Sequence, residues 1–192
     1  MIKSNTCILV LKDEDTKKLV FGADRRISFG NSFYQKTPRS KICKRNGLIL
    51  AGSGNAYLSD LVIELTPITF MNNVNESPFQ YIHTEFYNAL SKILMEKRII
   101  VDNKVIDNSS AAIMIGLKGD LFLLNISKSG ISIDVITTPF ALGCGGDVAL
   151  GSALVLLKDK NLSIKEILRK SVKTASLVSA GCDSTVDIVE ED

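Results

Sequence analysis

The order in which hydrophobic periodicities follow one another limits this chain to few architectures. Residues 6–52 form short strand-like runs, residues 57–93 carry apolar side chains at helical spacing, and residues 111–136 return to strand-like runs. Helical spacing resumes over 146–175, and a last strand-like run, 185–190, follows. Because strands and helices are segregated, alternating βαβ units are disfavoured. The order predicts an α+β fold: a four-layer α-β-β-α sandwich of two antiparallel sheets flanked by helix pairs.

The individual elements are delimited by turn and cap signals. Asn46-Gly47 is typical of a hairpin turn, Ser77-Pro78 of a helix start, and Ser163-x-x-Glu166 of a capping box. The expected strands are 6–11, 18–24, 26–30, 32–35, 41–44, 48–52, 111–117, 119–126, 130–136 and 185–190. We expect one helix from about 57 to 66, one over 77–98, one from 146 to 157 and one from 163.

Composition excludes several classes of function. With 45% hydrophobic and 23% charged residues over 192 positions, we expect a single globular domain, 1–192. The net charge is +2 and the basic residues are scattered, so no nucleic acid is expected as a partner. Apolar runs are far shorter than the roughly 20 residues of a membrane helix, and Met1–Asn5 lacks an apolar core, so we expect a cytoplasmic protein without a membrane partner.

Cysteine and histidine usage argues against a metal site. Cys7, Cys43, Cys144 and Cys182 lie far apart in the sequence, and no C-x-x-C pair occurs. The single histidine, His83, lies beside the apolar face of a predicted helix, where we expect an exposed or packing role. No metal and no cofactor are predicted, and the thiols are expected to be reduced.

Five short blocks carry a resemblance when they are taken together and in order. They are T-C-I-L-V-L (6–11), G-A-D-R-R-I-S-F-G-N (22–31), S-K-I (40–42), L-A-G-S-G (50–54) and L-G-C-G-G-D-V-A-L (142–150). In this order and at these spacings they resemble blocks of proteasome β-subunits and of HslV, which are N-terminal nucleophile (Ntn) hydrolases. The resemblance covers nearly the whole chain and implies the same sandwich fold.

The resemblance implies amide hydrolysis by an N-terminal threonine. Thr6 would be the nucleophile, and removal of residues 1–5, a possible short propeptide, would free the α-amine that accepts its proton. By the same resemblance, Lys41 would lie beside the hydroxyl, Asp24 would orient Lys41, and Gly52 would donate its N–H to the oxyanion.

Two further positions match the family with changes. Cys144 stands where the family usually has a serine near the terminal amine, and a thiol is a weaker hydrogen-bonding group. Ser176-Leu177-Val178-Ser179 resembles D-x-x-S, so Ser179 keeps the second role while Ser176 replaces the aspartate. Asn5, where the family often has glycine, precedes Thr6.

The predicted function is therefore that of a threonine-type endopeptidase subunit. The resemblance implies peptide or unfolded-protein substrates, a homo-oligomeric ring and an ATP-dependent unfoldase as partner. Two alternatives stay open. One is a catalytically inactive, proteasome-like scaffold that retains residues 1–5. The other is a small-amide Ntn hydrolase that uses Cys7, although strand alternation turns Cys7 away from the face of Thr6.

Overall fold

Two antiparallel sheets form the centre of the molecule. The computed structural model describes residues 6–29, 33–71, 76–101, 104–105 and 110–192. The first sheet has the order β12-β1-β2-β13 and the second β11-β10-β9-β6-β5. The strands of the first are β1 (Ile8–Lys12), β2 (Leu19–Asp24), β12 (Phe140–Leu142) and β13 (Val186–Glu190). Those of the second are β5 (Ile42–Arg45), β6 (Leu48–Gly54), β9 (Ala111–Leu117), β10 (Asp120–Ser127) and β11 (Gly130–Ile136).

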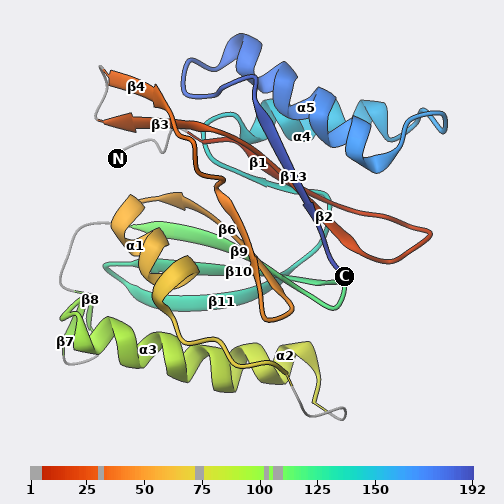
Figure 1. Cartoon of the computed structure of the whole chain (residues 1–192). Coiled ribbons are helices and arrows are strands. Elements are labelled where there is room, and N and C mark those ends of the chain that lie inside the picture. Colours follow the sequence, from red (N-terminus) through yellow and green to blue (C-terminus); the bar gives the residue numbers. More distant parts are fainter. Residues whose placement is uncertain (1–5, 30–32, 72–75, 102–103, 106–109) are drawn as a thin grey trace.

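Helices cover the outer face of each sheet (Figure 1). Over the first sheet lie α4 (Gly146–Leu156) and α5 (Ile164–Val178). Over the second lie α1 (Ala56–Asp60) with the π-helical turn η1 (Leu61–Leu65), and α2 (Pro78–Tyr81) with η2 (Ile82–Phe86) and α3 (Tyr87–Glu96). Two short hairpins, β3 (Arg26–Phe29) with β4 (Phe33–Lys36) and β7 (Ile100–Val101) with β8 (Lys104–Val105), complete the described elements.

Alternation along the strands separates three apolar layers. In β1, Ile8 and Val10 face the second sheet, whereas Leu9 and Leu11 face α4 and α5. Because successive side chains of a strand point to opposite faces, a strand that is buried on both sides contributes side chains to two apolar layers. Strand β6 likewise contributes side chains to the layer between the two sheets and to the layer beneath the α1 to α3 helices. The predicted four-layer α-β-β-α sandwich is thereby confirmed.

Cap signals located the helix starts correctly. The Ser77 side chain accepts a hydrogen bond from the N–H of Gln80, and Pro78 is the first residue of α2. Ser163 and Glu166 form both hydrogen bonds of the capping box at the start of α5.

Strand β12, which is only three residues long, was not predicted from the sequence. It pairs with β1, with Ile8 opposite Leu142, and it leads directly into the loop that precedes α4. The expected strand start at Thr6 is two residues early, because the β1 ladder begins at Ile8. Residues 30 and 32, expected at strand ends, lie outside the described residues. None of the helices in the described part of the chain is long and apolar enough to cross a membrane.

Candidate active site

The carboxylate of Asp24 is the centre of a buried hydrogen-bond cluster. Asp24 ends strand β2 and has no exposed surface. Its Oδ1 accepts from the backbone N–H of Cys7 at 2.8 Å, and its Oδ2 accepts from the N–H groups of Arg26 at 2.9 Å and Asp183 at 3.1 Å. Burial of a charge is costly unless hydrogen-bond donors and a counter-charge compensate it. The hydrogen bonds to the Asp24 carboxylate therefore hold three separate segments of the chain together.

Lys41 supplies the counter-charge and connects Asp24 to Thr6. The Lys41 side chain is 10% exposed, and its Nζ lies 2.6 Å from Asp24 Oδ1 and 3.3 Å from Thr6 Oγ1. Thr6 is itself buried. Because little water surrounds this cluster, the charge on Lys41 acts on the Thr6 hydroxyl with little screening. The structure thus brings together three of the residues that the sequence singled out.

The loop between β12 and α4 holds the main chain of Thr6. The N–H of Gly145 donates to the Thr6 carbonyl oxygen at 3.2 Å. Gly143 has a φ of +89°, and a Cβ built there would lie 2.0 Å from the same oxygen, so only glycine fits. The peptide that follows Thr6 is therefore fixed by this loop on one side and, through the N–H of Cys7, by Asp24 on the other.

Cys144 and Ser179, both predicted for the site, are in contact. Cys144 lies between the two glycines that touch Thr6, and its Sγ is 3.3 Å from Ser179 Oγ. Ser179 is the C-cap residue of α5. Ser176, in contrast, donates its hydroxyl to the carbonyl of Lys173 in its own helix. The loop that carries Cys144 thus joins the end of α5 to the Thr6 main chain.

Gly52 lies in β6, which pairs with the strand that begins directly after Lys41. The β5–β6 ladder ends at the pair of Ala51 with Ile42, and Gly52 and Lys41 are the chain neighbours of that pair. On its other side, a Cβ built on Gly52 would lie 3.0 Å from Ser59 Oγ in α1. A side chain would crowd this helix, so the absence of one lets β6 pass close beneath α1.

Comparison with known sequences gives full-length relatives. The ATP-dependent protease subunit HslV of Chlorobium luteolum is 28% identical over 193 residues, which cover 100% of this chain and 96% of the relative. HslV of Aquifex aeolicus is 26% identical over 192 residues, covering 99% of this chain and 98% of the relative. No protein-family model matches the chain.

Comparison with solved structures gives the same fold. Thiobacillus denitrificans BPH in complex with epoxomicin superposes with a TM-score of 0.72 at 16% identity, over 97% of this chain and 98% of that one. HslV from Trypanosoma brucei superposes with a TM-score of 0.67 at 19% identity, over 97% and 99%. The sequence relatives and the structural neighbours therefore both match this chain over nearly its whole length. The chain is HslV-like.

The position of Cys7 in this HslV-like chain argues against its use as the nucleophile. Cys7 is fully buried in the layer between the first sheet and the α4 and α5 helices. A hydrogen bond with Cys182 and burial raise the pKa of the Cys7 thiol well above its usual range. The thiolate is the nucleophilic form of cysteine, so a raised pKa suppresses the reactivity of Cys7.

Several supports of the site were not predicted. Gly143, Gly145 and Asp183 were not predicted individually, although the glycine density of 143–146 was a signal. Cys182 was not predicted for the site, yet its Sγ lies 4.0 Å from that of Cys144. His83 stacks on Phe79 with ring centroids 4.1 Å apart, in agreement with the expected packing role.

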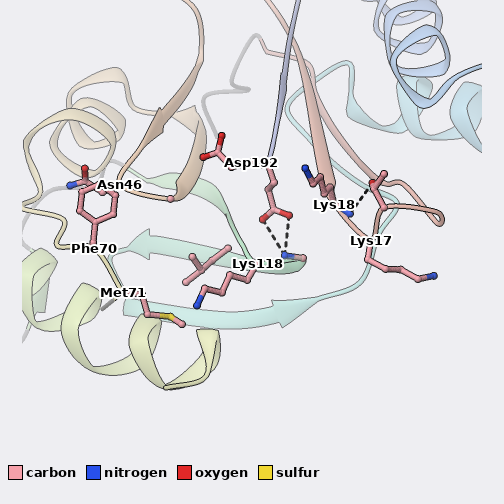
Figure 2. A pocket seen from close by; sticks show the side chains of 12 residues that line it. Lys17, Lys18, Asn46, Phe70, Met71, Lys118 and Asp192 are labelled. Carbon is pink, nitrogen blue, oxygen red and sulfur yellow. Dashed lines mark hydrogen bonds between the residues drawn. The ribbon is translucent and has the colours of Figure 1, made fainter. Parts of the chain in front are cut away.

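A cavity of about 460 Å³ opens at the end of the β1–β2 pair that is remote from Thr6 and Asp24. Figure 2 shows Lys17, Lys18 and Lys118 around it, together with Phe70 and Met71. Three hairpin turns line it, at 16–18, 46–47 and 117–119, with segments 70–71 and 191–192. None of the six residues predicted for the site lines this cavity, so it is a separate feature of the HslV-like fold.

Proposed function

We propose that this chain is an HslV-type threonine peptidase subunit whose nucleophile is Thr6, exposed by removal of residues 1–5. The observation that carries the proposal is the position of Lys41 Nζ, 3.3 Å from Thr6 Oγ1 and 2.6 Å from Asp24 Oδ1 in a buried cluster. The relatives named ATP-dependent protease subunit HslV, similar along almost the entire chain, support peptide-bond hydrolysis.

In the proposed mechanism, Lys41 acts as a cation rather than as a base. Its ammonium is paired with the buried Asp24 carboxylate, so it donates to the Thr6 hydroxyl and stabilises negative charge that develops there. The proton is accepted by the freed α-amine of Thr6, because α-amino groups titrate near about 7.7–8.0. Oγ1 then attacks the peptide carbonyl carbon, the amine product leaves with a proton, and water hydrolyses the acyl-threonine ester.

The remaining residues have supporting roles in this proposal. The N–H of Gly52, which follows the last pair of the β5–β6 ladder, would hold the oxyanion. Cys144 and Ser179, which are in contact, would lie around the freed amine and relay protons. The Gly145 N–H keeps the Thr6 carbonyl in place during attack.

The proposal extends to assembly and partners. We expect a single Ntn-hydrolase domain that forms a homo-oligomeric ring in the cytoplasm, receives peptides or unfolded proteins and works with an ATP-dependent unfoldase. The relatives are ATP-dependent protease subunits by name, which supports the ATP-dependent partner. Exposed apolar side chains support contacts between subunits. They are Leu154 and Val155 on α4 and Leu177 and Val178 at the end of α5. Native mass spectrometry measures the subunit number.

The test combines intact mass with three variants. Purified wild-type chain should lack residues 1–5 and cleave fluorogenic peptides. Thr6→Ala should lower this activity by more than about 10³-fold, because no hydroxyl remains. Thr6→Ser should retain measurable activity. Thr16→Ala, in the exposed β1–β2 turn, is the matched control and should cleave like wild type.

Each contrary outcome has a distinct meaning. A wild-type chain that keeps residues 1–5 and is inactive would be the non-catalytic scaffold. An N-terminus at Cys7 would indicate the small-amide hydrolase. Peptidase activity that survives Thr6→Ala would refute the assignment of Thr6.

A further inference from the structure

Three of the four cysteines meet beside the candidate active site. Cys7 precedes β1, Cys144 lies in the loop before α4, and Cys182 follows α5, yet all three lie around Gly145. The Cys144 and Cys182 sulfurs are 4.0 Å apart, and all four cysteines of the chain are free. Within the described part of the chain, no three such side chains are placed to hold a metal ion. The cluster therefore offers thiol chemistry.

The loop geometry permits a bond between Cys144 and Cys182. A disulfide needs a sulfur–sulfur distance of about 2.05 Å, so the two atoms have to approach by about 2 Å. Gly145 carries no side chain between them, and a Cβ built there would lie 2.4 Å from Cys182 Sγ. The sulfur of Cys182 thus rests against the backbone of the residue that follows Cys144. Rotation of the Cys144 side chain from Ser179 toward Cys182 shortens the gap.

The two thiols differ in their access to solvent. Cys144 is partly exposed, whereas Cys182 is buried. Hydrogen bonds from Cys7, and further from Ser179 and Cys144, lower the pKa of the Cys182 thiol, despite its burial. This arrangement suits a pair in which the accessible thiol meets an oxidant and the buried thiolate resolves the product.

We propose that Cys144 and Cys182 form a reversible disulfide when the chain meets a hydroperoxide, and that this bond disables the site at Thr6. The Cys144 thiolate attacks one peroxide oxygen, the O–O bond breaks and hydroxide leaves, which gives a sulfenic acid. The Cys182 thiolate then attacks the Cys144 sulfur, the S–S bond forms, and the S–O bond breaks with loss of a second hydroxide. Both hydroxides take up the protons lost by the thiols. In sum, two thiols are oxidised and hydrogen peroxide is reduced to two waters.

The effect on the site follows from the place of Cys144 in the loop. It stands between Gly143 and Gly145, and both of these touch the carbonyl oxygen of Thr6. Movement of the Cys144 sulfur toward Cys182 breaks its contact with Ser179 and pulls on this loop. The loss of activity, unlike the bond itself, rests on the proposed function of Thr6.

The test treats purified full-length chain with hydrogen peroxide and maps disulfides by mass spectrometry. Wild type should lose two hydrogen atoms in intact mass and yield a Cys144–Cys182 peptide pair, while Cys43 stays open to alkylation. Cys43→Ser is the matched control and should behave like wild type. Cys182→Ala, or Cys182→Ser if the first variant folds poorly, should form no disulfide.

Two functional readouts accompany the mapping. Peptidase activity of wild type should fall at least tenfold with peroxide and return with dithiothreitol. Hydrogen exchange at the Gly145 amide, which donates to Thr6, should rise in the oxidised chain even if the chain has no peptidase activity. Absence of the disulfide, a Cys7–Cys182 pair in its place, or unchanged Gly145 exchange would overturn the inference. An inactive reduced chain that still forms the bond and shifts Gly145 exchange would count against the proposed function alone.

Discussion

Replacement of Asp24 by asparagine is the sharpest test of the buried cluster. The side chain keeps its size and shape but loses its charge. Asp24 has no exposed surface, and its two oxygens accept four hydrogen bonds, three from backbone N–H groups and one from the Lys41 ammonium. Asp24→Asn therefore leaves the packing intact and changes only the charge and the hydrogen-bond acceptors.

The expected magnitude follows from the geometry of an amide, which keeps one acceptor oxygen and turns the other into a donor. If the amide nitrogen takes the place of Oδ1, the Cys7 N–H and the Lys41 ammonium lose their acceptor. If it takes the place of Oδ2, the N–H groups of Arg26 and Asp183 lose theirs. Two buried donors are unsatisfied in either case, at about 1–3 kcal/mol each. We expect the free energy of unfolding to fall by about 4 kcal/mol.

Urea unfolding followed by far-UV circular dichroism measures this loss, since the chain has no tryptophan to report by fluorescence. With a slope of about 2 kcal/mol/M, the midpoint should fall by about 2 M at equal protomer concentration. Glu14→Gln is the matched control, because its exposed pair with Lys17 should contribute less than about 0.5 kcal/mol. A loss at Asp24 as small as that of the control would refute the reasoning.

Two further predictions concern the loop that holds the main chain of Thr6 and the start of α5. Gly143→Ala should lower the free energy of unfolding by more than about 3 kcal/mol, because its Cβ would collide with the Thr6 carbonyl. The control Gly47→Ala, at φ +82° in open space, should lower the free energy of unfolding by only about 1–2 kcal/mol. Equal losses would contradict the close approach of Gly143 to Thr6. Hydrogen bonds from Ser163 lower the pKa of Glu166. The stability that this carboxylate adds is therefore fully present above its unfolded pKa of about 4.3 and lost as pH falls through the lower folded value. Urea titrations of wild type and Glu166→Gln should converge at low pH, and a constant difference would contradict the assignment.

Elements with long periodic patterns or strong cap signals were predictable from the sequence. The continuous β-branched and apolar run over 6–11 identified β1, and Ser163 located α5, because these signals are local. Strand β12 has only three residues, too few for a periodicity, and it exists because β1 offers an edge for pairing. The π-helical turns η1 and η2 interrupt helices that the apolar spacing predicted as regular.

The candidate site was predictable where residue types matched a known pattern. Thr6, Asp24 and Lys41 were singled out in this way, and they lie together. The meeting of Cys144 with Cys182 was not predictable, because it depends on how the end of α5 packs against the loop before α4. Neither segment carries a local signal for the other.

The Asp24 cluster also depends on the order in which the chain is synthesised. One of its hydrogen-bond donors is the N–H of Asp183, which lies 159 residues later in the sequence. During synthesis on the ribosome, the Asp24 carboxylate is therefore made well before this hydrogen-bond donor. A chain that stops before Asp183 therefore lacks one of the hydrogen-bond donors to Asp24, and the whole cluster beside Thr6 forms only after residue 183 has been added.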